Sequence, residues 1–225
     1  MQLVKPSFNI ESPILPASVL QAIERAGRTC YKSEDRITED SAEKFIKMLI
    51  KRGHETVLEH EKLTIRFICD RGISHQIVRH RLASFSQEST HYINYQTKGE
   101  DIAFILPPWV AIPEGIYNTN NINTWIKNTW NLADYSWFNG MLFAEDLYDR
   151  LCNNGWRYDK ARSVLPMSLK TELVMTMNFR ELRYFLKLRT QKTDHEQMRE
   201  LTVPLLNYLK IQYPPLFEDL PDQEL

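Results

Sequence analysis

Two segments far apart in the chain alternate apolar and polar side chains. They span residues 63–70 and 171–178, and a period of two is typical of half-buried β-strands. The second runs into a stripe of helical period at 179–189, for which Asn178 can act as the N-cap. A chain with both periods must pack helices against a sheet. We therefore predict an α+β fold, a mixed sheet with flanking helices, in a single domain covering 1–225 with a helical segment inserted between strands.

Turn and cap residues predict the other elements. Further strands are expected at 92–95 and 103–106, and further helices at 16–25, 41–52, 74–79, 156–165 and 194–213. Gly27 and Gly53 are expected to end the first two of these helices, and Ser74 to cap the third. Residues 54–60 read as a loop or short helical turn, and 116–154, which includes Trp125, as a long helix or two broken at Gly140.

Composition excludes several classes of protein. The net charge of -1 argues against a general nucleic-acid binder. No run reaches the length of a membrane helix, and the first residues lack a signal-peptide core, so we expect a cytoplasmic protein without a membrane partner. Three widely spaced cysteines fit a reducing compartment and provide neither a disulfide framework nor metal spacing. No Gly-x-Gly occurs, so the dinucleotide fingerprint and the phosphate loop are absent.

One polar stretch has the chemistry of a ligand site. Arg79-His80-Arg81 is followed, after two apolar residues, by the hydroxyl- and amide-rich run 84–89. These donors suit a polyanionic ligand such as a nucleotide. The alternative is a solvated helix end, because cations are favourable near a helix C-terminus. We expect the stretch to begin on a helix end and to continue into an ordered loop.

Three motifs, which occur in a fixed order along the chain, together resemble those of a known family. Arg79-His80-Arg81, seven residues and then Ser89 resembles the signature of the flavin-dependent thymidylate synthases. Gly53-His54-Glu55-Thr56 with Glu59-His60 is similar to the family's upstream motif, and Asn178-Phe179-Arg180-Glu181-Leu182-Arg183 with Leu188-Arg189 to its downstream helix. The resemblance covers about 28–199.

The resemblance implies a reaction and its ligands. Such enzymes methylate C5 of deoxyuridine monophosphate (dUMP) to give dTMP. Methylenetetrahydrofolate supplies the carbon, reduced FAD supplies the hydride, and NADPH is the reductant. They are homotetramers that share sites between subunits. No metal is expected.

The resemblance also assigns residues. The flavin-binding set is Thr56, Arg79, His80, Arg81, Gln87, Asn178, Arg180 and Tyr184. The nucleotide-binding set is Gln76, Arg79, Gln87, Glu88, Ser89, His91, Arg162 and Arg189. The catalytic set is Arg189, expected to polarise the pyrimidine, and Ser89, which has no adjacent base and is read as a binding group rather than a nucleophile.

Arg189 and His91 leave alternatives open. Arg189 continues an apolar stripe and needs an acceptor, either a structural carboxylate or a substrate oxygen. His91 stands where the family carries an arginine on the nucleotide, which would make phosphate affinity weaker or pH-dependent, or change the substrate. The segment Asp194-His195-Glu196-Gln197 and Tyr184 also depart from the family pattern. The alternative functions are a flavoenzyme acting on another pyrimidine nucleotide and a nucleotide- or RNA-binding module without chemistry.

Overall fold

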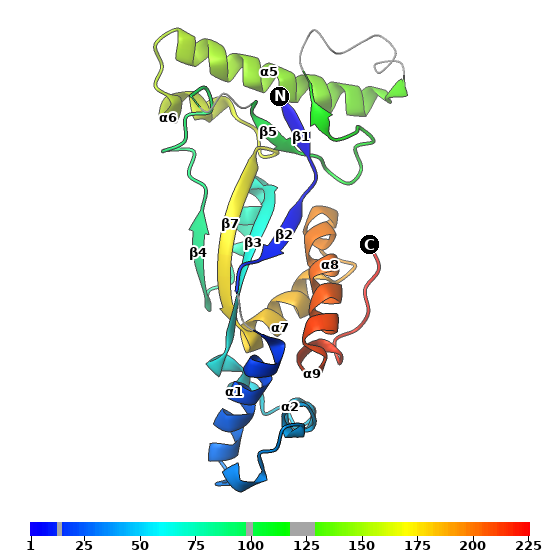
Figure 1. The fold of residues 1–225 in the computed structure, drawn as a ribbon. Helices are drawn as coiled ribbons and strands as arrows, with labels where there is room; N and C mark the ends of the chain where they lie inside the picture. The colour runs from blue at the N-terminus through cyan, green and yellow to red at the C-terminus, as the bar shows by residue number, and fades with distance from the viewer. Residues whose placement is uncertain (13–14, 98–100, 118–128) are drawn as a thin grey trace. The chain divides into compact units, whose positions relative to one another are not determined.

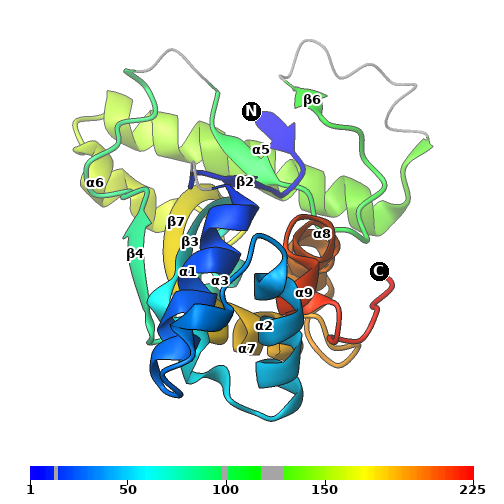
Figure 2. The same ribbon diagram turned by 60° about the horizontal axis from the view of Figure 1, so that its bottom comes forward.

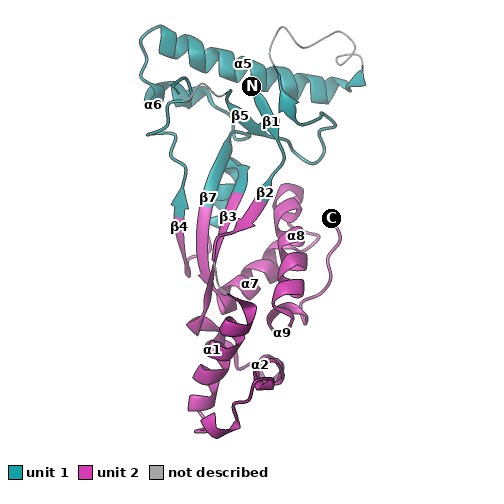
Figure 3. Ribbon diagram, in the orientation of Figure 1, with its two compact units in different colours: residues 1–7, 68–78, 86–173 teal, residues 8–67, 79–85, 174–225 magenta. Residues whose placement is uncertain are grey.

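The computed structural model describes residues 1–12, 15–97, 101–117 and 129–225 (Figure 1). The predicted segment 116–154 thus falls partly outside the described residues, and Trp125 lies outside them. The chain divides into two compact units, which Figure 3 distinguishes by colour. The first comprises 1–7, 68–78 and 86–173, and the second comprises 8–67, 79–85 and 174–225.

The first unit has a small sheet and a long helix. Its strands lie in the order β5 (Ala103–Ile105), β1 (Gln2–Val4), β6 (Gly115–Ile116). Strand β1 is parallel to β5, with Leu3 opposite Phe104, and antiparallel to β6. The helices are α3 (Arg71–Ile77), α5 (Leu132–Asn153), α6 (Tyr158–Ala161) and η3 (Arg162–Val164). Apolar residues of β1, β5 and α5 form one buried cluster.

The second unit is mainly helical. Its helices are α1 (Pro16–Thr29), η1 (Glu34–Arg36), α2 (Ser41–Lys51), η2 (Glu55–His60), α7 (Phe179–Arg189), α8 (Glu196–Gln212) and α9 (Pro214–Phe217). Helix α2 packs against both α1 and α9, as Figure 2 shows. Helix α7 packs against α8 and η2. The apolar stripe of α7 (Leu182, Phe185, Leu186) is fully buried, which explains its helical period.

A second sheet has the strand order β2 (Ser7–Ile10), β3 (Lys62–Asp70), β7 (Lys170–Asn178), β4 (Ala83–Gln87). Burial alternates along β3 and β7, so the two predicted strands are confirmed. Helices α5 and α6 lie in the chain between β6 and β7, which confirms the inserted helical segment. The α+β class is therefore confirmed, and a single domain over 1–225 stays a prediction.

Glycine at position 27 does not end α1, contrary to the prediction. The helix continues to Thr29, and a Cβ on Gly27 would lie 2.7 Å from the ring of Phe45. This glycine therefore serves helix packing rather than helix termination. Gly53 does follow the end of α2, with φ of 72°, as predicted.

The element after β3 also differs from the prediction. Asp70, not Ser74, caps α3, since its Oδ1 accepts from the amide of Ile73 at 2.7 Å. The Ser74 hydroxyl instead donates back to the carbonyl of Arg71. The helix ends at Ile77, and the expected ordered loop contains strand β4.

Two further expectations were wrong. Residues 92–95 form no strand, because the amides of Tyr92 and Ile93 both donate to the carbonyl of Ser89. The helix expected at 156–165 is only the short α6 followed by a 3-10 turn. Of the two alternatives at Gly140, the long unbroken helix is confirmed, since α5 runs through this glycine, where open space surrounds the missing side chain. Among the described residues, no helix is both long and apolar enough to cross a membrane.

Candidate functional site

The residues expected in one site are divided between the two units. The second unit holds Thr56, Arg79, His80, Arg81, Asn178, Arg180, Tyr184 and Arg189. The first unit holds Gln76, Gln87, Glu88, Ser89, His91 and Arg162. Each group has its own geometry and is described separately.

In the second unit, His80 and Arg189 meet although 109 positions separate them. Arg189 Nε donates to His80 Nε2 at 3.1 Å, and the other imidazole nitrogen, Nδ1, lies 3.4 Å from Glu181 Oε1. Arg189 Nη1 donates to Asp194 Oδ2 at 3.3 Å. We call His80, Glu181, Arg189 and Asp194 the His80 network.

The contacts of the His80 network define the protonation of its imidazole. His80 is 6% exposed, and its ring packs edge-on against Phe185 at 4.9 Å between centroids. Burial, and then the positive charge of Arg189, lower the pKa of His80 below its ordinary value, against the opposing hydrogen bond with Glu181. Because Nε2 accepts from Arg189, the proton of the neutral ring belongs on Nδ1, where it faces Glu181.

Arg189 is held by contacts to its guanidinium group and to its backbone. Two of its five N–H groups bond to His80 and Asp194, and its backbone carbonyl accepts from the buried hydroxyl of Thr202 at 2.8 Å. Three N–H groups remain without a partner in the described part of the chain. The need for an acceptor is thus met by a carboxylate and an imidazole, while donors remain for a ligand.

The other arginines expected at the flavin, Arg79, Arg81 and Arg180, are exposed. Arg79 and Arg81 form no ion pair with any residue that the structure describes. Arg180 pairs with Glu59. Asn178 is the N-cap of α7, its side-chain oxygen accepting from the amide of Glu181 at 2.8 Å. Thr56 is exposed on η2, and Tyr184, 57% exposed, approaches the His80 ring edge-on.

In the first unit, Glu88 belongs to an ionic group with Lys170. Glu88 Oε2 lies 3.3 Å from Lys170 Nζ, which also donates to Glu172 at 2.7 Å. Burial alone would lower the pKa of Lys170, but hydrogen bonding and attraction to the two carboxylates outweigh it and raise the pKa. Gln87 donates to the hydroxyls of Ser74 and Thr171 at 2.8 and 3.2 Å. Gln76 lies half-buried on α3.

The turn at 89–92 contacts the segment 157–162. Arg162 donates to the hydroxyl of Thr90 at 2.8 Å, and His91 Nδ1 lies 3.8 Å from Asp159 Oδ2. Arg157 also bonds to Asp159, and this hydrogen bond lowers the pKa of Asp159 to about 2. Ser89 Oγ accepts from the amide of His91 at 3.2 Å, which is a structural contact. The turn therefore contacts a segment that has two exposed guanidinium groups, of Arg157 and Arg162, and one ionised carboxylate, Asp159.

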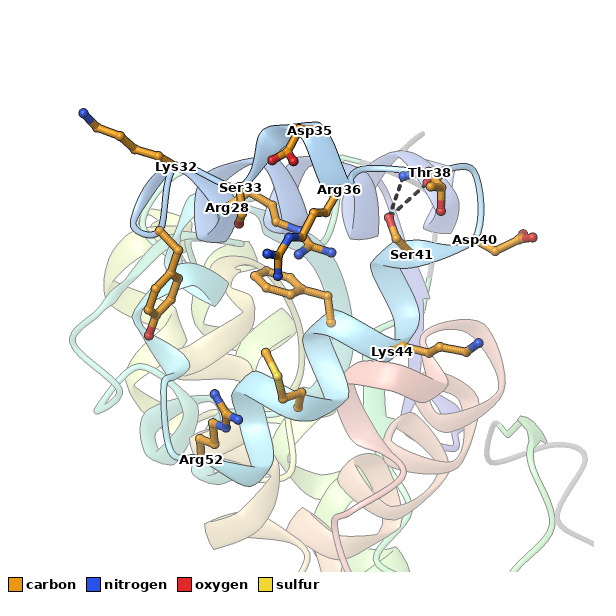
Figure 4. A pocket seen from close by; sticks show the side chains of 13 residues that line it. Arg28, Lys32, Ser33, Asp35, Arg36, Thr38, Asp40, Ser41, Lys44 and Arg52 are labelled. Carbon is orange, nitrogen blue, oxygen red and sulfur yellow. Dashed lines mark hydrogen bonds between the residues drawn. The ribbon is translucent and has the colours of Figure 1, made fainter.

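A hollow of about 920 Å³ lies on the segment 28–52 of the second unit. Figure 4 shows Arg28, Arg36 and Arg52 directed toward it from α1, η1 and the end of α2. Arg28 lies 4.1 Å above the ring of Phe45 and bonds to Glu24. The lining contains five basic and two acidic side chains, so the hollow suits an anion. In the described residues, no three His, Cys, Asp or Glu side chains group to hold a metal.

Sequence reasoning missed four partners of these groups: Glu181, Asp194, Asp159 and Lys170. For Glu181 a signal existed. It lies four and eight positions before Phe185 and Arg189, which places all three on one face of α7. The contacts of Asp159 and Lys170 join segments more than 60 positions apart, and no periodicity indicates them.

The fold is shared with a solved nucleotide methylase. The crystal structure of the UMP/dUMP methylase PolB from Streptomyces cacaoi, bound with 5-Br UMP, has a TM-score of 0.71 to this chain. The match covers 97% of this chain and 95% of the other at 21% identity. At this identity the likeness shows the fold alone.

Sequence comparison identifies the family. The family model "Thymidylate synthase complementing protein" matches residues 17–215. The flavin-dependent thymidylate synthase of Geobacter sulfurreducens is 30% identical over 205 residues, 88% of this chain and 80% of that protein. The enzyme of Pyrococcus furiosus is 30% identical over 181 residues, 80% of this chain and 67% of that protein. The chain belongs to the Thy1 family of flavin-dependent thymidylate synthases, so the family resemblance is confirmed.

The match to some relatives is partial. It spans 64% of the flavin-dependent thymidylate synthase of Thermococcus onnurineus, so about a third of that protein lies outside it. The family is one of flavin-dependent nucleotide methylases.

Proposed function

We propose that this protein is a thymidylate synthase that converts dUMP to dTMP, with methylenetetrahydrofolate as carbon donor, reduced FAD as hydride donor and NADPH as reductant. Family membership and the three motifs support this reaction. The observation that carries the proposal is the anchored guanidinium of Arg189, which retains three N–H donors.

Arg189 has the properties that the chemistry requires. Addition of a hydride or a carbon nucleophile to a pyrimidine places negative charge on the ring and its carbonyl oxygens. A guanidinium fixed before the reaction stabilises that charge without reorganising, and such donors are worth most in sites shielded from water. The partners of Arg189 hold it in place, and it is only 19% exposed.

The exposed donors of the second unit fit a flavin. The diphosphate of FAD needs several N–H donors, and Arg79, Arg81 and Arg180 provide guanidinium groups. Thr56 and Asn178 add a hydroxyl and an amide, and His80, Tyr184 and Gln87 complete the proposed flavin-binding set. When bound, the flavin supplies the hydride, while the residues of this chain bind and orient it.

For the nucleotide we propose Gln76, Arg79, Gln87, Glu88, Ser89, His91, Arg162 and Arg189. The guanidinium of Arg162 and the ring N–H of His91 are donors that suit the phosphate. Folate and dUMP are the proposed small-molecule partners, with a homotetramer as the proposed assembly.

A second candidate is a methylase of another pyrimidine nucleotide. His91 replaces the expected arginine, and the similar fold of PolB is that of a UMP/dUMP methylase. Ribose and deoxyribose nucleotides differ by one hydroxyl, so a modest change in the site can change the preference.

The test is a titration of dUMP into the flavin-loaded protein, followed by flavin absorbance, with UMP and deoxycytidine monophosphate in parallel. A saturable change with dUMP, together with formation of dTMP, supports the proposed reaction. If the protein binds and converts UMP or deoxycytidine monophosphate in preference to dUMP, that nucleotide becomes the proposed substrate. If the protein takes up no flavin, the result would favour the alternative function of a nucleotide- or RNA-binding module without chemistry.

A further inference from the structure

The His80 network holds two carboxylates that the resemblance does not assign. Glu181 lies in the first turn of α7, and Asp194 lies between α7 and α8. Both face members of the proposed site, and both are largely shielded from solvent, with side chains 12% and 14% exposed. A carboxylate in such a place lowers stability unless its charge is compensated.

The contacts form a chain with one consistent assignment of protons. Glu181 Oε1 lies 3.4 Å from Nδ1 of His80, where it faces the ring proton, His80 Nε2 accepts from Nε–H of Arg189, and Asp194 accepts from Nη1–H of Arg189. The bond from Arg189 to His80 requires the proton on Nδ1, because an imidazole with its proton on Nε2 cannot accept from Arg189. The guanidinium is thereby held at two of its three nitrogens.

We propose that Glu181 and Asp194 are positioning residues, which fix Arg189 so that its remaining N–H groups meet the pyrimidine. Glu181 acts through His80 by keeping the proton on Nδ1, and Asp194 acts directly on the guanidinium. This inference rests on the proposed function, in which Arg189 polarises the base.

The network also makes the position of Arg189 sensitive to acid. A doubly protonated His80 has only donors, so it would oppose Arg189 instead of accepting from it. The titratable or charged groups near His80 are Glu181, Tyr184 and Arg189 from α7, and Asp194. Glu181 and Asp194 both favour the protonated ring. Replacing either with its amide should therefore move the acidic limb of kcat/KM to lower pH.

The first measurement is the tautomer of His80 in the wild-type holoenzyme by long-range proton–nitrogen correlation, with His80→Asn to assign the signal. We expect a neutral ring protonated on Nδ1 at neutral pH. A ring protonated on Nε2, or on both nitrogens, would overturn the proposal because it cannot accept from Arg189.

The second measurement is steady-state kinetics of Glu181→Ala, Glu181→Gln and Asp194→Ala. We expect kcat/KM for dUMP to fall about tenfold in Glu181→Ala and Asp194→Ala at unchanged flavin content, since small displacements of a reacting group are costly. Glu181→Gln should recover part of the loss, because its amide oxygen still accepts from Nδ1–H.

Asp222→Asn is the matched control, because Asp222 pairs with Lys210 in the same unit and its side chain is almost fully exposed. We expect wild-type kinetics from it. Values within twofold of wild type for Glu181→Ala and Asp194→Ala would overturn the inference and leave the proposed function intact. A wild-type protein that converts no pyrimidine nucleotide would overturn the proposed function and this inference with it.

Discussion

Arg189→Lys tests the central assignment. Arginine bonds to His80 and Asp194 from two different nitrogens and keeps three N–H groups. Lysine has a single nitrogen with three N–H groups, so maintaining both contacts leaves one donor and no planar edge. Loss of one well-placed donor to developing negative charge costs about 3 kcal/mol, or about a hundredfold in kcat.

The assay is kcat and KM for dUMP, with flavin content read from absorbance. We expect kcat to fall about a hundredfold while flavin binding is retained. Arg150→Lys is the matched control, because Arg150 lies on α5 and forms an exposed pair with Asp146. Near-normal turnover of Arg189→Lys would refute the polarising role. A parallel loss of flavin would show that the residue acts in cofactor binding instead.

Further predictions concern stability and substrate affinity. Gly27→Ala should lower the free energy of unfolding in urea by about 1 kcal/mol through overpacking, whereas Gly140→Ala, in open space, should raise it by about 0.5–1 kcal/mol; a gain at Gly27 would contradict the packing argument. Asp219→Asn should cost about 1 kcal/mol at pH 7, a value discounted because this carboxylate is 45% exposed, although Arg183 is buried. The hydrogen bond from Arg183 lowers the pKa of Asp219, so its contribution is complete above the ordinary carboxyl pKa of about 4 and is lost as the pH falls through the lowered value. An Asn variant whose deficit persists in strong acid would rule out this linkage. His91→Arg should lower KM for dUMP about threefold by adding a permanent charge, and a higher KM would argue against phosphate contact at this position.

The clearest successes of sequence reasoning were the elements with strong local signals. Burial alternates from Lys62 to Cys69 in β3 and along the whole of β7, and Asn178 caps α7 as its position indicated. Period and capping depend on neighbouring residues, so the local sequence is sufficient to predict them. The strand expected at 92–95 failed because the carbonyl of Ser89 accepts from two of its amides. Apolar composition does not show which partner a backbone amide will find.

Sequence alone determined the α+β class, the family and the residue types of the proposed site, because motifs and periodicity are written along the chain. Only the tertiary structure brought Arg189 to His80, which lies 109 positions away, and Arg162 to Thr90, 72 positions away. Packing also decided that Gly27 serves a helix contact, that Glu181 lies beside His80 and that Asp194 accepts from Arg189. These outcomes depend on distances between residues remote in sequence, which a one-dimensional pattern does not contain.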